Sequence, residues 1–170
     1  MRSAEDLARA RADCAAAGTV GFDTESRPAF RKGEVHLPCL AQVATARAVY
    51  LFPLRDAAVH AVLATLLGEP RIVKAGVGLA DDLRPLQQVF PFTPRNMLDL
   101  GQVARQHGLA QTGVRNLAGI LLGSRIPKGS RTSNWAAREL SAAQISYAAT
   151  DAWVCRELCL HFATRHWLPG

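Results

Sequence analysis

The chain has 170 residues, with 49% hydrophobic and 20% charged side chains, a formal net charge of +6 and a pI of about 9.7. This length fits one globular domain with a full core, and no apolar run approaches the roughly 20 residues that cross a membrane. We therefore expect a single domain over residues 1–170 with no membrane partner, and the positive charge suits a polyanion such as nucleic acid.

The cysteines and the N-terminus favour a cytoplasmic location. Cys14, Cys39, Cys155 and Cys159 form no CxxC pair and no Cys/His zinc pattern, so we expect free thiols that pack as small hydrophobic residues in a reducing compartment. Residues 1–18 carry three acids and no continuous apolar stretch. They predict an amphipathic helix rather than a signal peptide.

Strand and helix patterns alternate along the chain, which predicts an α/β domain whose mixed sheet is flanked by helices. After the first helix, strands at 19–24, 38–45 and 48–52 follow, the last two joined by a tight turn as part of an antiparallel meander. A basic loop at 26–36 separates the first two strands. The later predicted elements are a helix at 54–67, a strand at 71–75, a helix at 79–89, a strand at 97–99, helices at 100–107 and 114–122, a basic loop at 123–134 and a long helix at 142–165 capped by Ser141.

Two carboxylates stand close together on the first predicted strand, in the sequence GFDTES. Side chains alternate faces along a strand, so Asp23 and Glu25 point the same way. Two neighbouring anions repel, and burying them unpaired is costly. A positive partner is therefore expected on that face.

Two further acids are candidates for the same site. Asp82 follows a predicted strand and a Gly-rich turn, and Asp151 lies in the long last helix, one turn after Tyr147. Each has an ordinary structural explanation when taken singly, and Asp81 competes with Asp82 as the acid at the start of its helix. Taken together, the acids form a set of hard oxygen ligands that suits two Mg²⁺ or Mn²⁺ ions roughly 4 Å apart, which would also supply the missing positive charge.

Three motifs follow one another along the chain: FDTES at 22–26, GVGLADDLRPL at 76–86 and YAATDAWVCREL at 147–158. In this order they resemble the DEDD superfamily of 3′–5′ exonucleases, which share an RNase H-like fold. The stretch at 133–151 and the sequence LAQVAT at 40–45 are similar to ribonuclease D and to the exonuclease domain of the Werner-syndrome helicase. The resemblance spans nearly the whole chain.

The resemblance implies a role for each residue of the set. Asp23 would bridge both metals, and Glu25 and Asp151 would hold the metal that carries the attacking water. Asp82, which the spacing from GVG favours over its neighbour, would bind the second metal largely through water. Tyr147 would orient the nucleophilic water, and the product would be a nucleoside 5′-monophosphate.

The third motif also separates two branches of the superfamily. One branch has histidine five residues before the aspartate, where this chain has Ser146; the other has tyrosine four residues before it, where this chain has Tyr147. The sequence therefore resembles the DEDDy branch. The five histidines are expected to be surface or hydrogen-bonded core residues: His36, His60, His107, His161 and His166.

Two basic loops flank these motifs and are candidates for holding the substrate backbone. The loop at 123–134 precedes the third motif, and the loop at 26–36 follows the first. Cations beside short hydrogen-bond donors suit contact with phosphates, although a solvated loop has the same composition. The predicted nucleic-acid-binding residues are Arg125, Lys128, Arg131, Ser133 and Asn134 in one loop and Arg31 and Lys32 in the other.

The leading hypothesis is a 3′–5′ exonuclease acting on the 3′ ends of single-stranded DNA or RNA, since the sequence does not choose between the two sugars. One alternative is an oligoribonuclease restricted to very short RNAs. Another is a catalytically silent nucleic-acid-binding module, which the presence of all four acids and the tyrosine disfavours. Ribonuclease D proteins usually carry further helical domains, so a chain ending at Gly170 is expected to act alone, as a homo-oligomer or with a partner.

Overall fold

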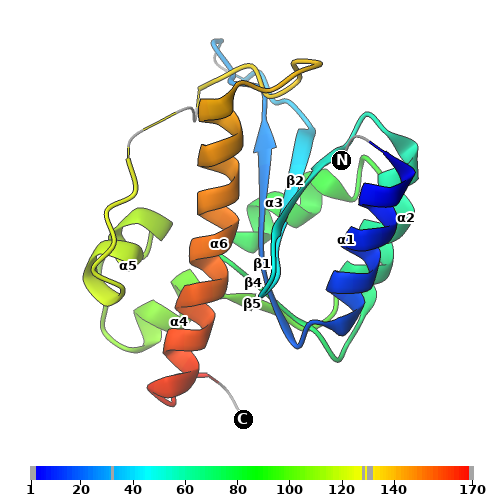
Figure 1. The fold of residues 1–170 in the computed structure, drawn as a ribbon. Helices are drawn as coiled ribbons and strands as arrows, with labels where there is room; N and C mark the ends of the chain where they lie inside the picture. The colour runs from blue at the N-terminus through cyan, green and yellow to red at the C-terminus, as the bar shows by residue number, and fades with distance from the viewer. Residues whose placement is uncertain (1–2, 32, 128, 130–131, 169–170) are drawn as a thin grey trace.

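A mixed five-stranded sheet runs through the centre of the computed structural model, which describes residues 3–31, 33–127, 129 and 132–168 (Figure 1). The strand order is β3-β2-β1-β4-β5, with β1 antiparallel to β2 and parallel to β4. The antiparallel meander and the parallel strands are both present, as predicted. The strands are β1 (Thr19–Ser26), β2 (Pro38–Ala44), β3 (Val49–Pro53), β4 (Val73–Gly76) and β5 (Met97–Asp99).

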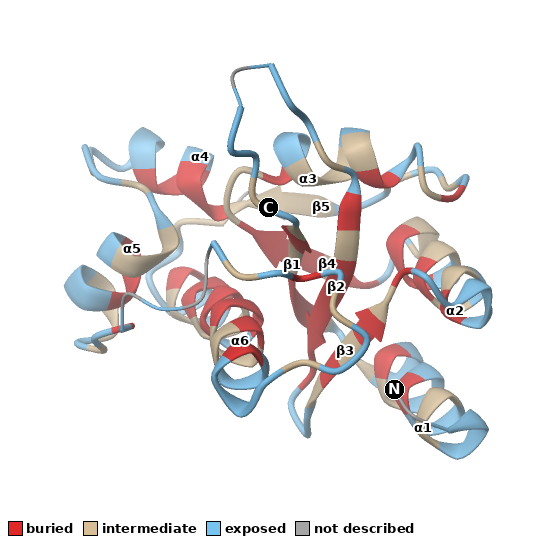
Figure 2. Cartoon of the chain, turned by 90° about the horizontal axis from the view of Figure 1, so that it is seen from above, coloured by how far each residue is buried: buried red, intermediate tan, exposed pale blue. Residues whose placement is uncertain are grey.

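Helices cover both faces of the sheet. One hydrophobic cluster joins α1, α2 and α3 to one face, and a second joins α4, α5 and α6 to the other. Figure 2 shows the buried residues along the sheet and on the helix sides turned towards it. None of the helices described is long and apolar enough to span a lipid bilayer. The helices are α1 (Ala4–Ala16), α2 (Ala57–Gly68), α3 (Leu79–Leu86), α4 (Leu100–Gln106), α5 (Val114–Leu121) and α6 (Ala142–Thr164).

The predicted elements are all found, and the differences lie at their ends. Helix α2 begins three residues later than predicted, because the Asp56 side chain accepts a hydrogen bond from the Ala58 N–H and caps the helix there. Strand β4 begins at Val73 rather than residue 71, since Arg71 turns back to bond the Glu69 carboxylate through its backbone N–H. Local side-chain bonds of this kind move boundaries that periodicity alone places only approximately.

The long helix α6 begins where the sequence predicts. Ser141 accepts a hydrogen bond from the Gln144 N–H, and the Gln144 side chain bonds the Ser141 N–H in return. Trp135 is buried beneath the start of this helix, in a cluster with Leu40 and Ala148. This tryptophan therefore packs under the last helix.

The cysteines are free thiols, as expected. Cys14, Cys155 and Cys159 are buried in the two large hydrophobic clusters, and Cys39 is partly buried on β2. Burial raises the pKa of Cys14 to about 12 and that of Cys159 to about 11. Thiols that stay protonated to such pH values are poor nucleophiles and poor metal ligands, so these side chains serve the core.

Candidate active site

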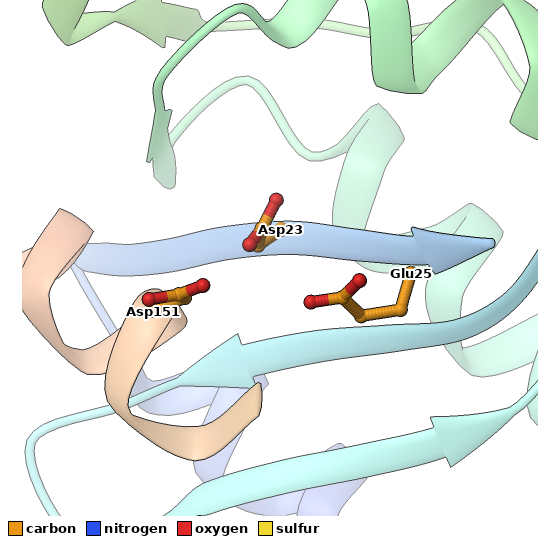
Figure 3. A group of neighbouring side chains, drawn as sticks. All are labelled: Asp23, Glu25 and Asp151. Atoms are coloured by element: carbon orange, nitrogen blue, oxygen red, sulfur yellow. The ribbon is translucent and has the colours of Figure 1, made fainter. Parts of the chain in front are cut away.

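Three carboxylates meet where β1 passes under α6 (Figure 3). Asp23 and Glu25 lie on the same face of β1, and Asp151 reaches them from the helix. One oxygen from each carboxylate lies within 4.8 Å of the other two. Asp151 is only 4% exposed and Glu25 only 9%. The fold therefore buries together an acid of β1 and an acid of α6, which lie far apart in the sequence.

Small residues allow α6 to approach the strand closely enough for this meeting. A Cβ atom added at Gly21 on β1 would fall on the carbonyl oxygen of Ala152, and it would lie 2.7 Å from the backbone nitrogen of Arg156. Ala148 and Ala152 flank Asp151 on the same buried side of the helix. The absence of bulk on both elements therefore places the Asp151 carboxylate beside the β1 acids.

Asp82 joins the site through Thr24, the residue between the two β1 acids. The Thr24 hydroxyl donates a hydrogen bond of 2.5 Å to Asp82 Oδ1, and the Thr24 N–H donates one of 2.9 Å to Asp23 Oδ1. Helix α3 begins after Gly78, which has the left-handed φ of 73° that glycine tolerates best. Of the two candidate acids in its first turn, Asp82 faces β1 and is half-buried, whereas Asp81 is exposed.

Burial raises the pKa values of Asp23, Asp82 and Asp151, and repulsion from neighbouring acids adds to the shift at Asp23 and Asp82. Burial is the largest cause at Asp23, and the charges of Asp82, Glu25 and Asp151 add to it, so the pKa of Asp23 lies well above its ordinary value. Burial also raises the pKa of Asp82 to about 6, although the Thr24 hydroxyl partly opposes the shift. The pKa of Asp151 is raised by burial as well. The protein alone leaves the charges of this cluster poorly compensated.

Tyr147 lies one turn before Asp151 and contacts it. Burial, followed by the charges of Asp151 and Glu25, raises the pKa of Tyr147 to about 12, and a side-chain hydrogen bond with Asp151 contributes. The same hydrogen bond lowers the pKa of Asp151. The Trp135 ring lies 5.9 Å from the Tyr147 ring, centroid to centroid. Tyr147 therefore presents a protonated hydroxyl at neutral pH, packed against an aromatic neighbour.

Arg115 brings a positive charge to this corner of the site. Its guanidinium carbon lies 6.0 Å from the centre of the Tyr147 ring, a cation–π contact. The Arg115 charge lowers the pKa of both Tyr147 and Asp151. It comes from α5, on the same side of the sheet as α6.

The chemistry of the donors fits a divalent cation. Only carboxylate oxygens make up the three-acid group, and Asp151 Oδ1 is buried with no hydrogen-bond partner among the residues that the structure describes. Oxygen donors without imidazole or thiolate suit Mg²⁺ or Mn²⁺ rather than zinc. A bound cation would give that oxygen a partner and offset the repulsion that raises the pKa values.

The predicted nucleic-acid-binding residues are described only in part. Arg125, Asn134 and Arg31 are exposed, and Ser133 is half-buried. The remaining three lie outside the described residues: Lys128, Arg131 and Lys32. None of the four described residues belongs to the three-acid group.

Three residues of the site escaped the sequence analysis as candidates: Thr24, Arg115 and Gln42. Gln42 is fully buried on β2 opposite Asp23, and neither atom of its amide has a hydrogen-bond partner among the described residues. A glutamine in the apolar strand PCLAQVA is a visible signal, since buried amides are costly unless paired. Arg115 gave no such signal, because a basic residue early in an amphipathic helix is usually solvated.

Comparison with known proteins identifies the family. A profile of the 3′–5′ exonuclease family matches residues 1–166, almost the entire chain. This chain belongs to the 3′–5′ exonuclease family. The resemblance to DEDD-superfamily exonucleases that the three motifs predict is thereby confirmed.

A curated relative is similar in sequence, and two solved structures are similar in fold. Ribonuclease D of Gluconacetobacter diazotrophicus is 35% identical over 136 residues, which are 78% of this chain and 34% of that protein; the chain thus spans about a third of this curated relative. Escherichia coli RNase D superposes with a TM-score of 0.82 at 22% identity, covering 99% of this chain and 46% of the other. Brucella melitensis NrnC with bound Mg²⁺ gives a TM-score of 0.74 at 23% identity, covering 90% and 75%. The predicted RNase H-like fold is confirmed.

Proposed function

We propose that residues 1–170 form a metal-dependent 3′–5′ exonuclease domain of the DEDDy type. The observation that carries this proposal is the meeting of Asp23, Glu25 and Asp151 with Tyr147 one helical turn away, in a chain of the 3′–5′ exonuclease family. Asp82 completes the set through Thr24. A silent binding module has no need of four acids held together against their own repulsion.

Asp23, Glu25 and Asp151 would hold one divalent cation, and Asp82 with Asp23 would hold a second. Bound Mg²⁺ or Mn²⁺ supplies Lewis-acid chemistry: it lowers the pKa of water and offsets charge on a phosphodiester. Support comes from the oxygen-only donor set and from the related Brucella NrnC, which has been solved with Mg²⁺.

The chain's own groups orient the reaction. Tyr147 keeps its proton at neutral pH, because its pKa is about 12, so its hydroxyl positions a water by hydrogen bonding rather than by removing a proton. The water oxygen forms a bond to the terminal phosphorus while the bond from phosphorus to the 3′ oxygen breaks. A proton passes to that oxygen, leaving a strand shortened by one residue and a nucleoside 5′-monophosphate.

The substrate is the 3′ end of a single-stranded DNA or RNA. A basic chain that carries exposed arginines in the loops beside the acids suits a polyanionic strand. A restricted oligoribonuclease is the second candidate, because Brucella NrnC has also been solved bound to pGG. A length series from two to about 20 nucleotides separates the two, since an oligoribonuclease would leave the longer strands intact.

The test is a cleavage assay on 5′-labelled single-stranded DNA and RNA in Mg²⁺, Mn²⁺ or EDTA. We expect a ladder that shortens from the 3′ end, needs metal and is absent with Asp23→Ala. Asp81→Ala is the matched control, because Asp81 is an exposed acid of the same helix turn as Asp82. Binding of the strand without cleavage in any metal would contradict the exonuclease and favour the silent module.

A further inference from the structure

A hollow lies between the loop that follows β1 and the segment that leads to Trp135. It has a volume of about 490 Å³, and its lining includes Arg27, Phe30, His36 and Asn134. One wall begins two residues after Glu25, and the other ends one residue before Trp135, whose ring contacts Tyr147. Both walls are thus continuous with elements that carry the site.

Phe30 stands at the edge of this hollow with 84% of its surface exposed. Hydrogen bonds hold the loop around it: Glu34 Oε2 accepts from the backbone N–H groups of Phe30 at 3.1 Å and Arg31 at 3.3 Å. The other Glu34 oxygen, Oε1, lies 3.0 Å from His36 Nε2, and Gly33 turns the chain with a φ of 86°. A hydrogen-bonded turn therefore presents the ring to solvent, and Phe30 belongs to none of the three hydrophobic clusters found among the described residues.

The opposite wall is fixed to helix α6. The Gln144 side chain donates a hydrogen bond of 3.2 Å to the Asn134 carbonyl oxygen, and the Asn134 side chain accepts one from the Ala136 N–H. Gln144 lies one turn before Tyr147 on the same helix. A ligand between the walls would thus meet a surface held in place by hydrogen bonds, one wall of it tied to the helix that carries Tyr147 and Asp151.

We propose that this hollow binds an unpaired nucleobase of the substrate strand, stacked on Phe30, with Arg27 meeting the adjacent phosphate. The inference rests on the proposed exonuclease function and adds to it a binding site for the single strand. Every base has a π-face, so stacking on an aromatic ring binds a strand without regard to sequence. Positively charged side chains beside the ring contact the phosphates of the same strand. A base within a duplex cannot offer its face in this way, so the site selects unpaired 3′ segments.

Equilibrium binding in EDTA tests the site apart from hydrolysis, using a fluorescein-labelled single-stranded oligonucleotide. We expect Phe30→Ala to bind about tenfold more weakly than the parent and Phe30→Tyr to bind as the parent does. Val35→Ala is the matched control, because Val35 is 82% exposed on the same loop but lines no part of this hollow. It should leave binding unchanged. Equal binding by Phe30→Ala and Val35→Ala would overturn the proposal.

A series of oligonucleotides with one abasic residue, moved stepwise from the 3′ end, locates the stacked base. The parent should lose affinity at one position, and Phe30→Ala should be insensitive to the same lesion. A loss at that position that is equal in both proteins would overturn stacking on Phe30.

Cleavage kinetics separate this proposal from the function on which it rests. Phe30→Ala should raise KM about tenfold and leave kcat near that of the parent, because the ring holds the strand and takes no part in the bond change. Binding that depends on Phe30 in a protein that cleaves nothing would contradict the exonuclease function and support the base-binding site. Cleavage with an unchanged KM in Phe30→Ala would do the reverse.

Discussion

Carboxylates on the two faces of the sheet meet opposite surroundings. On the α1 face, Asp13 accepts a 2.5 Å hydrogen bond from the Tyr50 hydroxyl and pairs with the Arg47 guanidinium at 3.0 Å. These partners, Tyr50 first, hold the pKa of Asp13 below its ordinary value. On the α6 face, the pKa of Asp23 is raised by burial and by three neighbouring acids.

Asp13 is therefore an acid whose charge stabilises the folded protein, whereas Asp23 is an acid whose charge the folded protein holds at an energetic cost. Ionised Asp13 is favoured by folding, so it ties α1 to β3 and the turn before it. Ionised Asp23 is disfavoured by folding, and the packing of α6 on β1 keeps it in place. Acids whose pKa values stay raised even with the Arg115 charge nearby mark a functional site better than the number of acids does.

The largest expected effect is that of removing the Asp23 carboxylate. We expect Asp23→Ala to lower the cleavage rate about a thousandfold or more, because it removes a carboxylate that both proposed cations would need and several kcal/mol of transition-state stabilisation with it. Its melting temperature in EDTA should not fall, since one of several repelling charges is gone. Cleavage assays and thermal melts check both parts; a melt far below that of the parent would contradict the site.

The two tyrosines of the chain offer a matched pair. Tyr147→Phe should lower kcat about a hundredfold by losing a positioned hydroxyl, while metal binding persists. Tyr50→Phe should leave kcat unchanged and lower stability, because it removes the hydrogen bond to Asp13. Undiminished turnover in Tyr147→Phe would take that residue out of the mechanism.

Divalent metal should stabilise the folded protein by binding at the acid cluster. At a hundred times its Kd, a cation that binds the folded protein alone adds about 2.7 kcal/mol to the free energy of unfolding. Thermal melts in increasing Mg²⁺ or Mn²⁺ should therefore move upward for the parent and for Asp13→Asn. A shift of the same size in Asp23→Ala would mean that the metal binds elsewhere.

The smallest expected effect is that of Asp13→Asn on stability. The folded protein lowers the pKa of Asp13, so its contribution is complete above the unfolded value of about 3.8 and is lost as the pH falls through the lower folded value. The difference in urea midpoint between parent and variant should thus shrink on acidification. A difference that stays constant from pH 7 to pH 3 would contradict the ionic role of Asp13.

The sequence predicted the parts of the site that backbone periodicity determines. The alternation of β1 places Asp23 and Glu25 on one face, and the helical repeat of α6 places Tyr147 beside Asp151. These relations hold wherever a strand and a helix form, so the pattern DxE and the pattern YxxxD were informative without coordinates.

Contacts between distant elements were not accessible in the same way. The hydrogen bond from Thr24 to Asp82 depends on how α3 leaves the turn at Gly78, and the approach of Arg115 to Tyr147 depends on how α5 packs beside α6. Neither position breaks a local rule of composition or spacing. Glu34 holds the loop that presents Phe30 by accepting hydrogen bonds from its backbone. From the sequence alone, this glutamate looks like an ordinary solvated surface acid.

The close approach of α6 to Gly21 has a consequence for how this protein tolerates mutation. Any side chain there would strike the backbone of α6, the helix that delivers Asp151. A saturation mutagenesis screen scored on activity would rank Gly21 with the four acids, although it takes no part in the chemistry. Scoring cellular abundance in parallel would separate them, because the acid variants should accumulate normally while variants at Gly21 are degraded.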